Sequence, residues 1–220
     1  MLLSNLAPRL GGGYLCLYEA GVGSGFSANR FLEYNYVKMK GCDVVLSERV
    51  KQLTEQYSDR FCFSEKTLYE DLKNIEDESI DIFYADNVFE HLIPDEFPMI
   101  MEVLKRKLKK NALLFLFIPN RLAGPGDVSR FYLNVGERAQ GFHFMELSYT
   151  EVIRALSEYN IVPYRNIFYG REKLITVKSN KFWNTIKEIL DFCINILPRN
   201  EFRKKYVALF GLYGYIMINR

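Results

Sequence analysis

The sequence predicts an α/β protein built on a doubly wound, mostly parallel sheet with helices on both faces. Short apolar runs alternate with amphipathic segments from residue 14 to residue 118, as in successive βαβ units. The predicted strands are apolar along most of their length, which is typical of parallel sheets buried on both sides. A glycine cluster follows the first run, where the strand ends of such a sheet bind ligands.

Five apolar runs in the first half are expected to be strands: residues 14–18, 43–46, 61–63, 79–85 and 112–118. Helices are expected between them over residues 27–39, 49–56 and 94–108. In the first of these helices Phe31, Leu32 and Tyr36 recur at helical spacing, and Gly41 is expected to end it. Pro94 suits the first turn of the third helix, because a missing donor costs nothing there. Residues 71–78 are polar and predict a loop or a frayed helix.

The second half is less regular. Residues 121–141 contain several glycines and a proline and are expected to be mostly loop. A helix is expected over residues 148–159, where Val152, Ile153 and Leu156 form an apolar stripe. Closing strands are expected over residues 161–168 and 213–219, with a helix over residues 181–197 between them.

Composition limits the class of protein. Of the 220 residues 49% are hydrophobic, enough for a buried core, and the formal net charge is only +2. Such a balance predicts no nucleic-acid partner, and the absence of an apolar run of about 18 residues predicts no membrane span. The four cysteines form no CxxC pair, so neither a zinc nor a redox motif is predicted, and no metal site. Residues 1–6 are too short and polar for a signal peptide, so we expect a cytoplasmic protein.

The glycine cluster carries the first chemical signal. Glu19 is followed by Gly21, Gly23 and Gly25, and glycines let a ligand approach the backbone closely. A dinucleotide site requires a sixth-position glycine, but Phe26 stands there. A phosphate-binding P-loop requires a lysine after its last glycine, and none follows Gly25. An acid with glycines two, four and six positions later resembles the first motif of class I methyltransferases, which use S-adenosylmethionine.

Further segments carry the same resemblance in the same order. Residues 81–92 read DIFYADNVFEHL and are similar to a segment ending in EHL in many small-molecule methyltransferases. Residues 108–114 are similar to the turn that leads into the family's fifth strand, although its usual proline and glycines are absent. The resemblance implies a Rossmann-like sheet of seven strands with the last strand antiparallel. It also implies one domain over residues 1–220, with a cofactor-binding half (1–120) and a substrate-side half (121–220).

The resemblance also implies which residues hold S-adenosylmethionine. Glu19 would lie near the amino-acid part of the cofactor, while Gly21, Gly23 and Gly25 would line its ribose side. Glu48 would bind the ribose hydroxyls as the acid after the second strand, or else it belongs to the start of the next helix. Glu65 would lie near the adenine amine, or else it is a surface carboxylate. Asn87 and His91 would close over the methionine end, with capping as the alternative role for His91.

The substrate side rests on residues 119–129 and 141–146. Both segments resemble a subgroup of methyltransferases that modify glycans and small metabolites, which often has histidine where this chain has Gly126. A hydroxyl acceptor benefits from a base, and His143 is one of two histidines in the chain. Our hypothesis is that His143 is this base, assisted by Asp127 or Glu146. The alternative is that His143 caps the next helix or packs under Tyr149.

The sequence therefore predicts a methyltransferase that acts on a small polar acceptor, such as a sugar or glycan intermediate. An inactive relative that serves as a binding or scaffold protein is the first alternative. A nicotinamide-dependent oxidoreductase is the second, and Phe26 argues against it. The C-terminal helix is expected to pack on the domain, to form a homodimer face or to make peripheral contact with a membrane surface.

Overall fold

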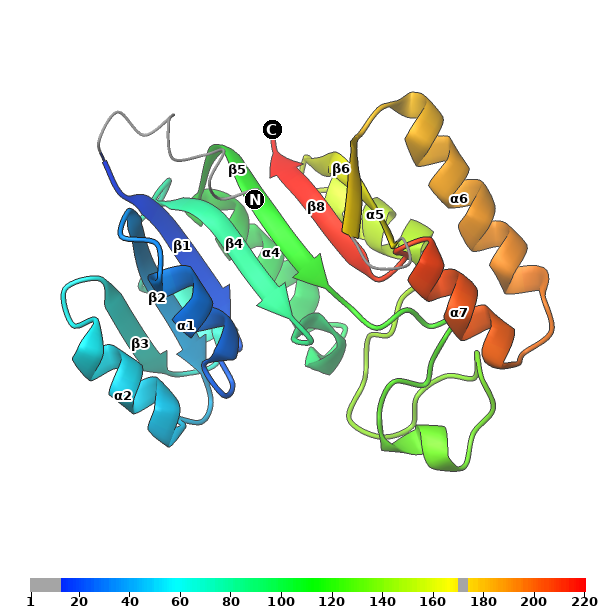
Figure 1. The fold of residues 1–220 in the computed structure, drawn as a ribbon, viewed down its shortest axis with the longest axis horizontal. Coiled ribbons are helices and arrows are strands. Elements are labelled where there is room, and N and C mark those ends of the chain that lie inside the picture. Colours follow the sequence, from blue (N-terminus) through cyan, green and yellow to red (C-terminus); the bar gives the residue numbers. More distant parts are fainter. Residues whose placement is uncertain (1–12, 170–173) are drawn as a thin grey trace.

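An eight-stranded sheet organises residues 13–169 and 174–220, the part of the chain that the computed structural model describes (Figure 1). Along the sheet the strands follow the order β3-β2-β1-β4-β5-β8-β6-β7. The strands are β1 (Leu15–Ala20), β2 (Val37–Asp43), β3 (Phe61–Glu65), β4 (Ile80–Asp86), β5 (Leu108–Phe117), β6 (Ile161–Tyr169), β7 (Leu174–Lys178) and β8 (Gly214–Asn219). The predicted doubly wound α/β fold is confirmed.

Strands β1 to β5 pair in parallel, and the strand order reverses beside β1. Ala20, the last residue of β1, is in register with Cys42 of β2 and Ala85 of β4. The carboxyl ends of these three strands therefore meet at one edge of the sheet. Ligands of doubly wound sheets bind at such a reversal.

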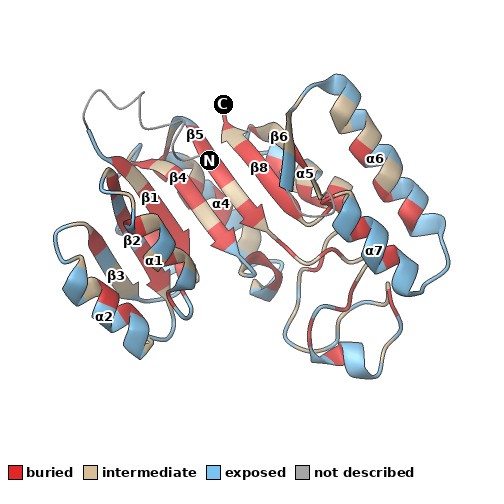
Figure 2. Cartoon of the chain, viewed as in Figure 1, coloured by how far each residue is buried: buried red, intermediate tan, exposed pale blue. Residues whose placement is uncertain are grey.

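Helices pack on both faces of the sheet. They are α1 (Phe26–Leu32), α2 (Glu48–Gln56), α3 (Leu68–Lys73), α4 (Glu96–Lys107), α5 (Tyr149–Ser157), α6 (Lys181–Ile196) and α7 (Glu201–Leu209). Because side chains alternate along a strand, Leu15 and Leu17 of β1 pack in one core cluster with α1 and α2. Tyr18 and Ala20 pack in the other, with α3, α4 and α5. Figure 2 shows the result, with strands mostly buried and helices buried along one side.

The second strand differs from the prediction. Helix α1 ends at Leu32 instead of residue 39, and β2 covers Val37–Asp43. Buried Val37 and Met39 alternate with exposed lysines, which is the period of a strand. Gly41 lies within β2 and ends no helix; a Cβ there would lie 2.5 Å from Val22 Cγ2. The predicted strand at residues 43–46 is wrong, since all but its first residue form an exposed loop after β2.

The C-terminal half completes the sheet with antiparallel pairs. Strand β8 lies between β5 and β6 and is antiparallel to both, which confirms the predicted antiparallel last strand. The described sheet nevertheless has eight strands instead of seven, because β7 pairs with β6 at the edge. Strand β7 and helix α7 are absent from the predictions. Both are short, and most of their residues are exposed or half-buried, so they carry a weak apolar pattern.

Helix α6 forms where it was predicted and keeps an exposed apolar face, which includes Phe182, Ile189, Phe192 and Ile196. Within the described ranges, no helix combines the length and the apolar character that crossing a bilayer requires. Packing of α6 against a second copy or a membrane surface stays a prediction. So does the single domain over residues 1–220. Residues 1–6, considered above for a signal peptide, lie outside the described residues.

Candidate functional site

Two cavities lie at the carboxyl edge of the sheet. The first, the β1–β2 cavity, has a volume of about 630 Å³. Its lining comes from the turn after β1, the end of β2, residues 66–70 after β3, and Asn87, Val88, His91 and Leu92 after β4. The second, the β5–α7 cavity, has a volume of about 500 Å³. Asn87 lines both, so the two cavities meet at the end of β4.

The β5–α7 cavity combines aromatic walls with a few polar groups. Its aromatic lining is Tyr84, Phe117 and Tyr213, and its polar lining includes Asp86, Asn87, Asn120 and Lys204. Gly124 and Gly126 contribute from the loop after β5, while Val207 and Ala208 contribute from α7. Small-molecule sites commonly have this mixture of apolar surface and a few placed polar groups.

The glycine turn after β1 packs tightly against its neighbours. The amides of Gly21 and Val22 both donate to Cys42 O, at 2.9 and 3.1 Å. Gly21 has a φ of 66°, and a Cβ on it would lie 2.5 Å from Val88 Cγ2. Only glycine tolerates both the left-handed backbone and this approach. Gly23 and Gly25 also have positive φ values, so the three predicted glycines shape one turn beside the β1–β2 cavity.

Glu19 lies at the end of β1 with its side chain buried and only 2% of the residue exposed. Its Oε2 atom has no hydrogen-bond partner among the described residues. Burial, together with the nearby carboxylates of Asp86 and Asp43, raises the pKa of Glu19 to about 8. A buried carboxylate without a partner is costly, so this position suits a ligand that carries a cation or a donor.

Asp43 is the acid at the end of the second strand, and the expected position of Glu48 is wrong. Asp43 Oδ2 accepts a hydrogen bond of 2.7 Å from Gly23 N, and the residue lines the β1–β2 cavity. Glu48 is the first residue of α2, where Ser47 caps the helix by accepting from Val50 N. It is exposed and is outside the lining of both cavities. The reason is the earlier start and end of β2.

Glu65 ends β3 in register with Asp43. Its side chain is exposed, and the cavity lining begins at the next residue, Lys66. Glu65 is therefore beside the cavity rather than part of its wall. Asn87 has a φ of 55° and is held by a 3.0 Å hydrogen bond from its amide to Phe117 O. Its side chain donates to Asp86 Oδ1 at 2.9 Å.

The three residues predicted for the acceptor side do come together. His143 Nδ1 lies 2.6 Å from Glu146 Oε1, and the same oxygen accepts a 2.6 Å hydrogen bond from Gly126 N. Asp127 accepts hydrogen bonds from the backbone and hydroxyl of Ser129 and from His143 N. Burial acts to raise the pKa of Asp127, but these hydrogen bonds outweigh it and lower the pKa. Glu146 therefore contacts the imidazole, while Asp127 holds the loop that carries it.

The imidazole of His143 lies behind Gly126 and is outside the lining of the β5–α7 cavity. A Cβ placed on Gly126 would be only 3.3 Å from His143 Cε1 and 3.0 Å from Glu146 Oε1. Gly126 itself lines the cavity. The ring thus fills the space that a side chain at position 126 would enter.

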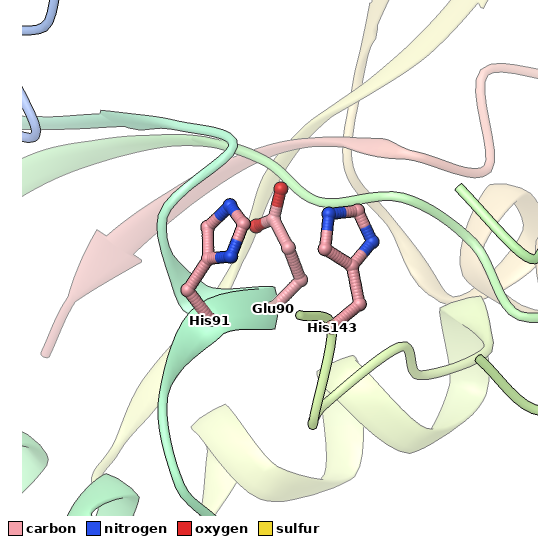
Figure 3. A group of neighbouring side chains, drawn as sticks. All are labelled: Glu90, His91 and His143. Carbon is pink, nitrogen blue, oxygen red and sulfur yellow. The ribbon is translucent and has the colours of Figure 1, made fainter. Parts of the chain in front are cut away.

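Glu90 is a further candidate that was not predicted from the sequence. It is fully buried in the 3₁₀-helix Phe89–His91, and neither carboxylate oxygen has a partner among the described residues. Burial raises its pKa to about 7. In Figure 3 the rings of His91 and His143 lie on either side of its carboxyl group, and one ligand atom from each of the three residues falls within 4.8 Å of the others. Its place in the EHL segment was the available signal.

Comparisons with known proteins agree with this geometry. Residues 18–116 match the family model described as a methyltransferase domain. A SAM-dependent methyltransferase from Archaeoglobus fulgidus shares 18% identity and a TM-score of 0.59, with 100% of this chain and 91% of that chain covered. Among proteins of curated function, none matches the sequence significantly.

Two further solved structures share the fold. The 1,6-didemethyltoxoflavin-N1-methyltransferase of Burkholderia thailandensis, solved with bound 1,6-didemethyltoxoflavin and S-adenosylhomocysteine, has 17% identity and a TM-score of 0.56 over 98% of this chain and 73% of that chain. The [4+2]-cyclase SpnF has 16% identity and a TM-score of 0.55 over 99% and 79%. At such identities the likeness establishes the fold, and the reaction has to be argued from the site.

Proposed function

The chain belongs to the class I S-adenosylmethionine-dependent methyltransferases, and from that premise we propose that it methylates a hydroxyl of a small polar acceptor, such as a sugar or glycan intermediate. S-adenosylmethionine is the methyl donor and supplies a methyl group already activated on a sulfonium. The acceptor would occupy the β5–α7 cavity, whose aromatic and polar lining suits a molecule with apolar faces and hydroxyl edges.

The observation that carries the cofactor half of the proposal is the buried carboxylate of Glu19, whose Oε2 has no hydrogen-bond partner among the described residues. The ammonium group at the methionine end of the cofactor would pair with it. Asp43, rather than Glu48, would accept hydrogen bonds from the ribose hydroxyls. The turn at Gly21 and Gly23 would let the cofactor approach the backbone. These residues fit the cofactor because they join a cation partner, an acceptor and an open turn at one strand edge.

The position of Asn87 supports a transfer point between the two cavities. Methyl transfer is an in-line displacement, so acceptor oxygen, methyl carbon and sulfur must align, and holding them in line supplies much of the acceleration. Asn87 lines both cavities, and its backbone is tied to β5 through Phe117 O. The residue would position the methionine end of the cofactor against an acceptor in the β5–α7 cavity.

The base that we propose is His143. Glu146 contacts Nδ1 of its ring, which leaves Nε2 to take the hydroxyl proton of the acceptor. The absence of a side chain at Gly126 would let the acceptor reach the ring from the cavity. Asp127 would act indirectly, since it binds the backbone of the loop that carries His143.

Calorimetric titration with S-adenosylhomocysteine tests the cofactor half. We expect the full chain to bind one equivalent, and Glu19→Gln and Asp43→Asn each to weaken binding by about tenfold, as for a lost charge-assisted contact. Glu48→Gln makes the matching change at the neighbouring acid outside the cavity and should leave binding unaltered. An equal loss from Glu48→Gln would contradict the reassignment to Asp43.

A panel of acceptors tests the other half. Sugar hydroxyl, phenol and amine acceptors are incubated with labelled S-adenosylmethionine, and methylated products are separated. Transfer to sugar hydroxyls supports the proposal. Transfer confined to amines or phenols would refute the acceptor class while leaving the cofactor site standing.

A further inference from the structure

We infer that Glu90, His91 and His143 form a binding site for a divalent transition-metal ion such as Zn²⁺. The site lies between the 3₁₀-helix Phe89–His91 and the loop that carries His143 (Figure 3). One ligand atom from each residue falls within 4.8 Å of the other two. Two imidazoles and one carboxylate are a ligand set that suits zinc, iron and nickel, whereas magnesium and calcium prefer oxygen ligands throughout.

The hydrogen bonds of the two rings favour metal binding. His91 Nδ1 lies 3.1 Å from the carbonyl oxygen of Phe142, and His143 Nδ1 lies 2.6 Å from Glu146 Oε1. Both partners accept hydrogen bonds, so each Nδ1 carries the proton and each Nε2 keeps a free lone pair. Metal-binding histidines usually have this arrangement, in which a carbonyl or carboxylate fixes the tautomer and orients the ring.

Glu90 is the independent observation that points to a ligand. The residue has no exposed surface, and both of its carboxylate oxygens lack a hydrogen-bond partner within the described ranges. Figure 3 shows its carboxyl group directed into the space between the two rings. A buried carboxylate is expected to be paired with a cation or with donors, and the described residues give the two oxygens of Glu90 no such partner. A divalent cation would supply the missing partner.

The backbone holds the two segments together without a metal. The carbonyl oxygen of Glu90 accepts hydrogen bonds from Phe144 N at 2.7 Å and from Met145 N at 3.0 Å. Around a tetrahedral zinc ion the ligand atoms stand about 3.3 Å apart, so the three groups must close by about 1.5 Å at most. His91 is exposed, so a small adjustment of its ring does not require repacking of the core. Three protein ligands also leave a fourth position for water or another ligand.

A bound metal would use the same lone pair as the base in the proposed function. Where His143 takes the acceptor proton, the metal competes with that proton for Nε2, so Zn²⁺ is expected to inhibit methyl transfer. This consequence rests on the proposed function, but the binding site itself does not. Direct metal binding and inhibition can therefore fail separately.

Metal binding is measured on the full chain after chelator treatment, by Zn²⁺ titration against a chromogenic competitor and by the visible absorption of bound Co²⁺. We expect one equivalent with the spectrum of nitrogen and oxygen ligands. Glu90→Gln, His91→Asn and His143→Asn should each weaken Zn²⁺ binding by tenfold or more, as about 10- to 100-fold follows even from loss of an outer partner. His91→Asn changes an exposed side chain and keeps the test valid if a buried variant fails to fold.

Two controls separate this site from other ligands. Cys62 and Cys193 are exposed, so the double change Cys62→Ser and Cys193→Ser should leave the affinity intact and the Co²⁺ spectrum unaltered. Glu102→Gln repeats the carboxylate-to-amide change at an exposed acid of α4 and should also leave binding intact. Loss of binding in the cysteine variant, or full binding in His91→Asn and Glu90→Gln, would overturn the site. Binding without inhibition would keep the site and count against His143 as the base.

Discussion

The two cavities at the strand edge are built in different ways. The β1–β2 cavity is lined by the end of β2 and by residues that follow β1, β2, β3 and β4, all between residues 21 and 100. The β5–α7 cavity joins Tyr84 and Phe117 to Lys204, Val207 and Tyr213. One cavity is thus assembled from consecutive βα units. The other combines the ends of the adjacent strands β4 and β5 with α7, which comes from a distant part of the sequence. A cofactor site can therefore follow from the βαβ fold itself, whereas an acceptor site depends on the segments that are added to that fold.

The largest expected effect is a loss of catalytic rate on removal of the His143 side chain. This change tests the residues behind the β5–α7 cavity and leaves the cofactor side unaltered. His143→Ala should lower kcat by about 10²- to 10³-fold, as for loss of a general base. Binding of S-adenosylhomocysteine should stay as in the unaltered chain. Added imidazole should restore part of the rate, which a merely structural role would not allow. Unchanged kcat, or no rescue, would remove His143 from the reaction.

The next effect concerns the rigidity of the glycine turn beside the β1–β2 cavity. Gly21→Ala should lower the free energy of unfolding by about 3 kcal/mol, because a left-handed alanine is strained and its Cβ meets Val88. Gly23→Ala is the matched control: its φ is also positive, but its nearest neighbour is 4.0 Å away. Denaturant unfolding should show a loss of only about 1 kcal/mol for it. Equal losses of stability in the two variants would mean that the clash with Val88 adds nothing to the effect of Gly21→Ala.

A third prediction tests whether the two cavities are independent. Ala208→Phe places a large ring on the α7 wall and should raise the KM of the acceptor by about tenfold, equivalent to about 1.4 kcal/mol. Ala208→Ser, a small change at the same position, should have little effect. The affinity for S-adenosylhomocysteine, measured by calorimetry, should be the same in all three proteins. Weaker cofactor binding in Ala208→Phe would show that the cavities are coupled.

The smallest expected effect is a pH dependence on the cofactor side. Burial raises the pKa of Glu19 to about 8, so its carboxyl is mostly neutral near neutral pH without a ligand. The cofactor ammonium binds the ionised form, so the affinity for S-adenosylhomocysteine should rise about tenfold between about pH 6.5 and about pH 8 and level off only above about pH 9. Titrations of Glu19→Gln at the same pH values should show a flat profile. A parallel rise in that variant would assign the pH dependence to another group.

Linkage also gives the sign for the stability of the protein without ligand. The folded-state pKa values of Glu19 and Glu90 are raised to about 8 and about 7. The unfolded chain therefore releases these protons at lower pH than the folded chain does. Their stabilising contribution is complete below the ordinary carboxyl pKa and is lost as the pH rises through the raised values.

Much of the fold could be predicted because its signals are local. The strands at residues 14–18, 79–85 and 112–118 were found as continuous apolar runs, within a few residues of β1, β4 and β5. The prediction for β2 is displaced for two reasons. Lys38 and Lys40 interrupt the apolar residues of the strand, and the apolar pair Val44 and Val45 has the composition of a strand although it is exposed. The same shift in strand position led to Glu48 as the expected acid after β2, whereas the strand ends at Asp43. The placement of one strand therefore changes which acid is proposed to bind the ribose.

The residues of the candidate site also divide into those with a local sequence signal and those without one. Glu19, Gly21 and Asn87 could be identified because each lies at a strand end that the motif order marks. The contact between His143 and Glu146 also joins residues close in sequence. Glu90 gave a weaker signal, since its burial depends on the loop that arrives from residues 142–145. The contribution of α7 to the second cavity had no local signal.

The alternating βαβ order, the glycine turn and the edge of the sheet that is expected to bind a ligand could be predicted from the sequence, because they follow from periodicity and from chain connectivity. Only the tertiary structure decided which acid ends β2, that Glu90 is sealed between two histidines, and that α7 closes the second cavity. Those features depend on the packing of segments far apart along the chain. Glu19 and Glu90 become buried, with carboxylate oxygens that lack a partner among the described residues, only when those segments pack together. This burial is what shifts the pKa of each carboxyl group.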